Sequence, residues 1–313
     1  IPTLYKSGII SVYEFLEKRF DASSRLLIAF VFQISRSVAT GVMVYTMALI
    51  LQATTGIEFW ISVILIGIIT MIYSFQGGMK AVIWGDVIQM CILFFGIVIC
   101  LGYGLSELGG VSNFLTEVDS DRLVAIDFTK WGFNNADGND EFGFWPMIIG
   151  GFFLYASYYG TDQTQSQRLL SSKDMPTIKR LLLANGIFRF PITLTYCFMG
   201  LVLGTLLLQD VGFQNLLDAT YQENIGSLAG KRADLMVPIF IIKYLPNGII
   251  GILIVAIMSA AMSSLSSTVN SLSAVTLEDF VKRFKPNVTD NEYVKYSRFI
   301  SLFWGLVCLG FAF

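Results

Sequence analysis

The sequence predicts an all-α membrane protein, and three observations support this prediction. Of the 313 residues, 54% are hydrophobic and only 14% carry a charged side chain, which is too apolar a composition for a soluble domain. The hydrophobic residues gather in seven stretches, most of them at least as long as the roughly 20 residues that cross a bilayer as a helix. Loops rich in Lys and Arg alternate with acidic or mixed loops, as expected for a chain that crosses a membrane repeatedly.

Hydropathy places the seven spans and the breaks between them. The spans cover residues 24–53, 57–76, 80–105, 144–169, 177–208, 235–276 and 294–313. Gly77-Gly78 is expected to break the second span from the third, and Pro246-Asn247-Gly248 is expected to launch the long helix of the sixth after a hydrophobic loop or short helix. Pro191 is expected to kink the fifth. Before the first span, residues 11–20 are typical of a short amphipathic helix at the membrane surface.

The loop charges predict the orientation of the chain. Basic residues precede the first span, follow the second, join the fourth to the fifth and join the sixth to the seventh. The loop at 106–143 is acidic and the loop at 209–234 is mixed. Because positively charged loops stay in the cytoplasm, the first span is predicted to run from the cytoplasm outward.

A polar stripe interrupts the sixth span. Residues 259–271 read SAAMSSLSSTVNS, with six serines, a threonine and an asparagine, and a buried hydroxyl without a partner costs a few kcal/mol. At about 100° per residue, these side chains share a sector of roughly 120° on one helix: Ala260, Ser263, Ser264, Ser267, Asn270 and Ser271. Such oxygen ligands suit a hard cation. Close helix packing through small residues is the alternative.

Several charged residues fall inside the predicted spans. Asp86, near the start of the third, is either an anionic ligand for a cation or an interfacial carboxylate that reaches water. Arg36, near the middle of the first, needs a carboxylate, either from a solute or from a helix that is not contained in this chain. Arg189, on the fifth, raises the same question, although it lies nearer the cytoplasmic end and can snorkel. Asp162 and Gln163, where the fourth span approaches the cytoplasm, are either further solute ligands or a helix cap.

Several functions are excluded. The chain has no histidine, which removes the usual general base and the commonest zinc ligand. Its four cysteines lie in apolar spans without a CxxC pair, which indicates packing rather than disulfides or metal binding. The net charge of −2 gives no sign of nucleic-acid binding. We therefore expect no enzyme. Because the chain begins without Met and stops within an apolar run, we expect residues 1–313 to be the interior of a longer membrane protein.

Four segments resemble the solute:sodium symporter family, and together they extend over nearly the whole chain in the family's order. They are YKSGIISVYEFLEKRF (5–20), AVIWGDVIQ (81–89), GTDQTQSQR (160–168) and PNGIIGILIVAIMSAAMSSLSSTVNS (246–271). The bacterial sodium/sialic acid symporters are the members most similar in these motifs. The resemblance implies the leucine-transporter fold, a five-plus-five inverted repeat. On that template the chain is an incomplete core, from about the third to the ninth core helix, without the first, second and tenth.

The resemblance also implies two sodium sites and a solute contact. The sodium site shared across the family corresponds to Ala260, Ser263 and Ser264, with its remaining ligands on the first core helix. A second sodium site, found in some members, corresponds to Asp86, Ser263, Ser266 and Ser267. Arg36 matches the arginine that holds the substrate carboxylate in sialic acid transporters.

The implied function is sodium-coupled symport of a small organic solute by alternating access in the plasma membrane. The solute would be an organic anion such as sialic acid, or a sugar; small zwitterions also remain open. A proton-coupled carrier and a membrane sensor domain of the same fold are the alternatives. The expected partners are sodium ions, the solute and the lipid bilayer, and the oligomeric state is not predicted.

Overall fold

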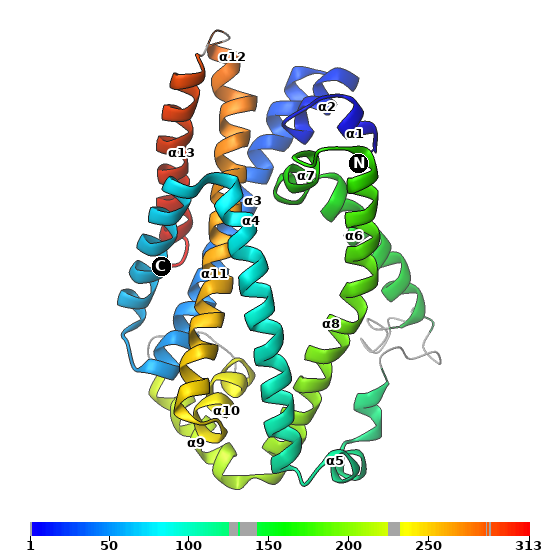
Figure 1. Ribbon diagram of the computed structural model, residues 1–313, viewed down its shortest axis with the longest axis vertical. Coiled ribbons are helices and arrows are strands. Elements are labelled where there is room, and N and C mark those ends of the chain that lie inside the picture. Colours follow the sequence, from blue (N-terminus) through cyan, green and yellow to red (C-terminus); the bar gives the residue numbers. More distant parts are fainter. Residues whose placement is uncertain (1, 125–130, 132–142, 225–231, 286, 288) are drawn as a thin grey trace.

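A computed structural model describes residues 2–124, 131, 143–224, 232–285, 287 and 289–313, with the side chains of Pro2, 73–82, Asn224 and Asp290 left out. The described chain is built from helices that run mostly along one axis (Figure 1). The first five are α1 (Pro2–Lys6), α2 (Val12–Arg19), α3 (Ala22–Thr55), α4 (Phe59–Glu107) and α5 (Val111–Glu117). After a short 3₁₀ turn, η1 (Ser120–Leu123), come η3 (Pro146–Gly150), α6 (Gly151–Gly160), α7 (Gln163–Leu170) and α8 (Met175–Gln209). The chain ends with α9 (Val211–Asn224), η4 (Arg232–Leu235), α10 (Met236–Tyr244), α11 (Asn247–Val275), η5 (Thr276–Val281), α12 (Lys282–Phe284) and α13 (Asp290–Gly310).

All seven predicted spans coincide with helices. In the described residues, four helical segments are long and apolar enough to cross a membrane: Ala22–Thr55, Ile83–Glu107, Met175–Gln209 and Asn247–Phe284. A shorter apolar segment, Phe59–Ile72, corresponds to the second span. The predicted short helix at residues 11–20 is confirmed as α2, whose first turn is capped by the Ser11 side chain. Residues 125–130 and 132–142 of the acidic loop lie outside the described part.

The expected break at Gly77-Gly78 is wrong as a helix boundary, since α4 is one helix from Phe59 to Glu107. Its path nevertheless reverses, rising and then descending in Figure 1. The contacts agree with this reversal. Gly67 lies against Leu309 of α13, and further along α4 Gly96 lies against Leu253 and Asp86 against Ser263 of α11. The two halves of α4 therefore serve as two antiparallel spans, as the hydropathy predicted.

The fourth span is broken, which the sequence did not predict. It begins as η3 and α6, and α6 ends at Gly160. Thr161 leaves the helical conformation, and Asp162 then caps the first turn of α7. By contrast, Pro191 lies inside α8 without interrupting it. The interruption in a membrane helix thus falls at Thr161-Asp162 and not at the proline.

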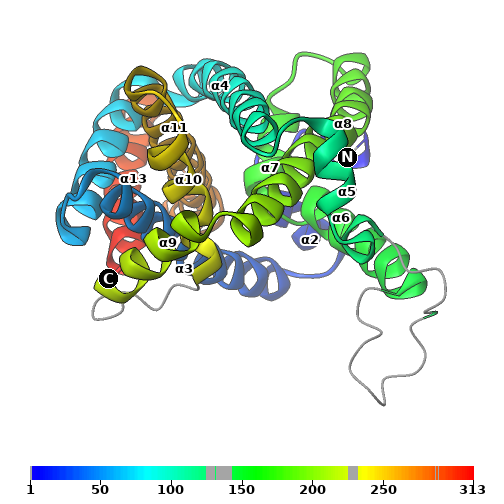
Figure 2. The same cartoon turned by 90° about the horizontal axis from the view of Figure 1, so that it is seen from below.

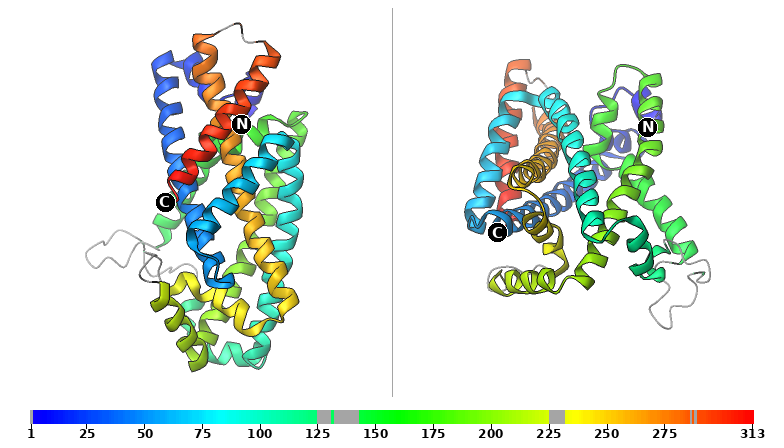
Figure 3. Two further views of the ribbon diagram at one scale, coloured as in Figure 1. Left: turned by 90° about the vertical axis from the view of Figure 1, so that its left-hand side faces the viewer. Right: turned by 60° about the horizontal axis from the view of Figure 1, so that its bottom comes forward.

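Two apolar cores hold the molecule together. The first packs α3, the first half of α4, α11 and α13 around buried residues such as Val44, Ile66 and Leu272; Figure 3 shows α13 beside α4 and α11. The second joins the second half of α4 to α8, α9 and α10 through Leu203, Phe213 and Phe240. Figure 1 shows α9 and α10 at the end opposite α2, and Figure 2 looks onto that end. Of the loop or short helix expected at the start of the sixth span, the structure has the short helix, α10, whereas α5 and α9 were not predicted.

Candidate functional site

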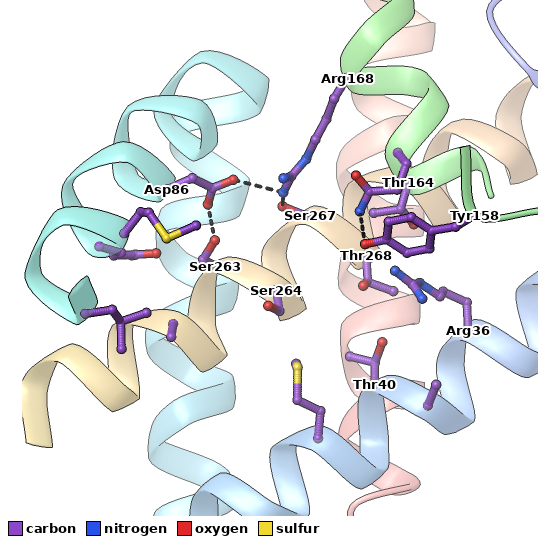
Figure 4. Close-up of a pocket in the computed structure, with 17 residues that line it drawn as sticks. Arg36, Thr40, Asp86, Tyr158, Thr164, Arg168, Ser263, Ser264, Ser267 and Thr268 are labelled. Atoms are coloured by element: carbon purple, nitrogen blue, oxygen red, sulfur yellow. Dashed lines mark hydrogen bonds and ion pairs between the residues drawn. The ribbon is translucent and has the colours of Figure 1, made fainter. Parts of the chain in front are cut away.

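The polar stripe of α11 faces a cavity of about 400 Å³. On the opposite side of α11, buried Leu265, Val269 and Leu272 pack into the first apolar core, which fixes the rotation of the helix. The residues of the stripe that line the cavity are Ala260, Ser263, Ser264 and Ser267, joined by Thr268 of the same helix, whereas Asn270 and Ser271 are not part of the cavity lining. Figure 4 shows Ser263, Ser264 and Ser267 on the same side of this helix. The amphipathic pattern of the helix therefore directs these small polar residues into the cavity; that they bind a cation stays a prediction.

Asp86 lies across the cavity from this stripe and takes part in a network of charged and polar contacts (Figure 4). The Ser263 hydroxyl donates to the carboxylate of Asp86. Arg168 pairs with the same carboxylate, with 2.9 Å between Nη2 and Oδ2, and also donates to the Ser267 hydroxyl. Of the three serines predicted as its neighbours, Asp86 thus contacts Ser263 directly and is connected to Ser267 through Arg168. The third, Ser266, is fully buried and does not line the cavity, and its hydroxyl has no partner among the described residues.

Sequence reasoning missed Arg168, which had been counted only as a loop charge. It lies four residues after Thr164 and three after Gln165, and all three side chains line the cavity. Residues at these spacings share one face of a helix. The signal that could have found it is therefore the helical spacing within the GTDQTQSQR segment, once that segment is assigned to a helix of its own.

Arg36 and Asp162 form a second ion pair at the edge of the cavity. Their Nη1 and Oδ2 atoms are 3.3 Å apart, and their side chains are 28% and 16% exposed. The other oxygen of Asp162 accepts a hydrogen bond from the backbone N–H of Thr164 at 2.8 Å. Asp162 is therefore both a helix cap and the carboxylate partner of Arg36. The Nε atom of Arg36 is buried and has no hydrogen-bond partner among the described atoms, so this donor is unsatisfied there.

The two remaining solute candidates lie elsewhere. Gln163 is fully buried and does not line the cavity. Its side chain accepts from the backbone N–H of Val12 and donates to the carbonyl of Ile10, each at 2.9 Å. Arg189 is exposed on α8, with its guanidinium 4.7 Å from the ring centre of Tyr155. The structure brings neither side chain to the cavity that Arg36 and Asp86 share.

Further polar side chains complete the cavity wall. Gln165 donates to the Tyr158 hydroxyl at 2.7 Å. Thr40, Thr164 and Thr268 are almost fully buried and line the same space, and the Thr164 hydroxyl has no partner among the described atoms. No group of three or more His, Cys, Asp or Glu side chains in the described part could hold a metal ion. The donor set, mainly hydroxyls with one carboxylate, suits an alkali cation better than a transition metal.

Charges around the cavity balance in two pairs. Arg168 pairs with Asp86, and Arg36 pairs with Asp162. In a region of low dielectric, an unpaired charge would be strongly destabilising. Any cation that enters must therefore either compete with one of these arginines or arrive with an anion.

The sequence model of the sodium:solute symporter family matches residues 1–312. Among individual relatives, the human sodium/iodide cotransporter is 30% identical over 99% of this chain and 46% of its own length. The rabbit (Oryctolagus cuniculus) sodium-dependent multivitamin transporter is 32% identical, over all of this chain and 47% of its own length. The human sodium-coupled monocarboxylate transporter 1 is 31% identical, over all of this chain and 49% of its own length. The chain thus spans about half the length of these relatives.

A solved structure shows the same fold. It is the substrate-bound outward-open state of a Na⁺-coupled sialic acid symporter, matched with a TM-score of 0.78 at 27% identity over 99% of this chain and 62% of that one. This match confirms the predicted leucine-transporter-type architecture with an incomplete core.

Proposed function

Because the chain belongs to the sodium:solute symporter family, we propose that it forms the central part of a carrier that couples the movement of a small organic solute to sodium. The observation that carries this proposal is the convergence of the α11 hydroxyls and the Asp86 carboxylate on one cavity. All the relatives described above are sodium-coupled transporters by name, which argues against an enzyme. We propose that residues 1–313 correspond to the third to ninth core helices of a multi-pass protein of the plasma membrane.

The first proposed sodium site uses the backbone carbonyl of Ala260 and the hydroxyls of Ser263 and Ser264. All three residues line the cavity, and oxygen ligands of this kind replace the water around a hard cation. The remaining ligands would come from the first core helix. Sodium bound here would connect that helix to α11. It would favour whichever conformation it binds more tightly, and only by the difference between its two affinities.

The second proposed sodium site uses Asp86, Ser263, Ser266 and Ser267. In the structure Arg168 contacts both Asp86 and Ser267, so sodium at this place would take over the carboxylate that now pairs with the guanidinium. Ser266 would have to turn its buried hydroxyl toward the cavity. Binding of the second ion is therefore expected to depend on the position of α7, which carries Arg168.

We propose that the solute is an organic anion. The two ion pairs leave the cavity close to neutral, so each sodium that enters adds a positive charge, which an anionic solute would offset. Arg36 lines the cavity and its Nε donor has no hydrogen-bond partner among the described atoms; a carboxylate that reached this side chain would bind it with two parallel hydrogen bonds. The names of the relatives include iodide, monocarboxylate and sialic acid, all of which are anions or acids that ionise. A carboxylated sugar or another small organic acid fits this reasoning better than a neutral sugar.

Solute uptake into vesicles that contain the full-length protein tests the coupling. Sialic acids, monocarboxylates, sugars and amino acids would be offered with external sodium, and then with choline or lithium in its place. We expect uptake of at least one organic anion, and we expect it to fall at least tenfold without sodium, since the ion gradient and membrane potential supply the drive (each charge adds about 2.3 kcal/mol per 100 mV). Uptake driven equally well by a pH jump without sodium would instead establish a proton-coupled carrier. Sodium-dependent binding without uptake would favour a sensor.

The number of sodium ions is tested separately with Asp86→Asn. Replacing the carboxylate by an amide removes the only anionic ligand proposed for the second site while the residue keeps its shape. We expect the Hill coefficient for sodium to fall from near two to near one, with uptake still dependent on sodium. If the parent and the variant both give a coefficient near one, the second site is excluded and the first remains.

A further inference from the structure

The turn between α1 and α2 lies between two parts of the molecule that are far apart in the sequence. On one side is α7, the short helix after the break in the fourth span. On the other is η5, which continues from α11. Ile10 and Val12 contact α7, and Ser11 between them contacts η5. This end carries the basic loops and is predicted to face the cytoplasm.

Gln163 makes the connection to α7. Its carboxamide pairs with the main chain of the turn as another peptide group would, accepting from Val12 N–H and donating to Ile10 C=O at 2.9 Å each. Gln163 is fully buried, so water cannot replace these bonds at a low free-energy cost. Gln163 is the first residue of α7 and directly follows Asp162. Its attachment therefore fixes the end of α7 that carries the ion pair with Arg36.

Ser11 makes the connection to η5. Its hydroxyl donates to Oδ2 of Asp279 at 2.7 Å, and the Asp279 side chain is fully buried. Arg25 of α3 donates from Nε to Oδ1 of the same carboxylate at 2.7 Å and from Nη2 to the carbonyl of Glu278 at 2.9 Å. The turn is thereby attached to a buried ion pair that also joins α3 to η5.

Two further contacts strengthen the attachment of α2 to the broken span. The Tyr13 hydroxyl donates to the carbonyl of Thr161, at the break itself, at 3.1 Å, and Tyr13 is almost fully buried with its ring 5.6 Å from that of Phe32 in α3. A small apolar cluster of Leu4, Ile9 and Val12 includes Leu170 at the far end of α7. Both ends of α7 are thus held by the segment that precedes α3.

We propose that the α1–α2 turn is a clasp that holds α7 against α3 and η5 and keeps the cytoplasmic side of the central cavity closed. This inference rests on the proposed transport function. The α7 helix also carries Arg168, which pairs with Asp86 on the far wall of the cavity. Opening the cavity toward the cytoplasm requires α7 to move away from α3 and α11, and the clasp resists that movement. Gln163, which the sequence suggested as a solute ligand, is in this account a positioning residue that acts through α7.

The test measures how often the cavity opens to the cytoplasm. Ala39 is exposed to the cavity, so Ala39→Cys, in a chain whose exposed Cys91 and Cys197 are changed to Ser, reports access for a membrane-impermeant thiol reagent. Labelling would be followed in inside-out vesicles in sodium. With Gln163→Leu, which keeps the volume but removes both hydrogen bonds, we expect labelling about fivefold faster and a half-saturating sodium concentration raised by a similar factor. Maximal uptake per folded transporter should change much less.

Ser11→Ala breaks the other side of the clasp and keeps the proposal testable if Gln163→Leu does not fold. It should give the same increase in labelling, and the double variant should add little to either single change, because each opens the same connection. Tyr293→Phe is the matched control. It removes a 2.8 Å hydrogen bond to Glu278 at the same end of the molecule, but between α13 and η5, and should leave labelling unchanged.

The proposal is overturned if Gln163→Leu and Ser11→Ala label at the parent rate, or if Tyr293→Phe accelerates labelling as much as they do. These outcomes are separate from failure of the proposed function. If the proposed function is wrong, the parent protein itself will show no sodium-dependent uptake, whatever the labelling rates of the variants.

Discussion

The broken segment α6–α7 and the continuous helix α8 contrast with what their sequences suggest, because the proline lies in the helix that is not broken. The stretch Gly151–Leu170 contains no proline, yet it is interrupted between Gly160 and Gln163. Helix α8 carries Pro191 near its middle and runs without interruption from Met175 to Gln209. A proline removes one backbone donor, which a membrane helix tolerates when neighbouring groups adjust. An interrupted helix frees several backbone groups, and each of them needs a polar partner.

The difference lies in the polar partners that each region has. At the break, the carbonyl of Thr161 accepts from Tyr13 and the N–H of Thr164 donates to Asp162. The hydroxyl of Thr161 donates back to the carbonyl of Ser157 at 2.8 Å. Unpaired backbone groups within a membrane cost several kcal/mol each, so these side chains are what stabilise the interruption. In this protein, local polar side chains therefore mark the break, and the proline does not.

Asp162→Ala should produce the largest effect, because it removes both the cap of α7 and the partner of Arg36. A lost cap costs about 1 kcal/mol, and an arginine left buried without its partner costs several more. We expect sodium-dependent uptake to fall by tenfold or more. Asp162→Asn, which still caps but carries no charge, should retain part of the activity. Uptake and thermal stability of the purified protein measure the two losses, and equal losses for both variants would show that the cap contributes nothing.

The far end of α8 provides a smaller test, through pH. Asp210 follows the last residue of α8 and accepts from Lys243 at 2.5 Å, from the Tyr244 hydroxyl and from the N–H of Phe213 at 3.0 Å. The Lys243 ammonium, with the Tyr244 hydroxyl, holds the pKa of Asp210 well below its usual range. Because the folded state favours the carboxylate, its stabilisation is complete above the unfolded pKa of about 4 and is lost as the pH falls through the lower folded value.

Asp210→Asn should therefore lower the melting temperature at neutral pH by about 2 °C, a modest shift because the pair is partly exposed to solvent. It should also reduce the additional loss of stability as the medium is acidified below pH 4. Thermal unfolding of the parent and the variant across this pH range makes the measurement. Parallel curves would mean that the ion pair does not stabilise the end of α8.

The smallest effect is expected for Pro191→Ala. Since α8 is already continuous through this position, alanine restores one backbone donor to a helix that does not break there. We expect uptake and sodium affinity to stay within about twofold of the parent, and stability to stay equal or rise. A loss of activity comparable with that of Asp162→Ala would mean that α8 also changes conformation at Pro191 during transport.

Hydropathy was sufficient for the spans and for the polar face of α11, because both depend on periodic patterns along single segments. The structure also brings Asp86 and Ser263 into contact, while their role as sodium ligands stays a prediction. The partner of Arg36 could not be derived in this way. It depends on how α3 packs beside α7, and no pattern within either segment records that distance.

The same dependence on tertiary packing explains why the contacts of Gln163 and Arg168 were not predicted. Both stand in the GTDQTQSQR segment, and residue type alone made Gln163 the better solute candidate. The break at Thr161-Asp162 makes α7 a separate helix, which directs Arg168 toward Asp86 and Gln163 toward the main chain of Ile10 and Val12. The orientation of Gln163 depends on a tertiary contact with Val12, 151 residues away in the sequence, and that of Arg168 depends on its contact with Asp86 of α4.

The rotation of α11 about its own axis decides which of its two faces lines the cavity. Leu265, Val269 and Leu272 anchor one face in the apolar core while Ser263, Ser264 and Ser267 point into the cavity. One residue inserted between Met258 and Ser259 would leave the hydropathy profile almost unchanged but would rotate everything after it by about 100° relative to the preceding turns. The leucines and the serines all follow this point and would rotate together, so both faces would point the wrong way if the turns before Ser259 kept their place. A single added codon could abolish ion recognition in a protein that still inserts into the bilayer.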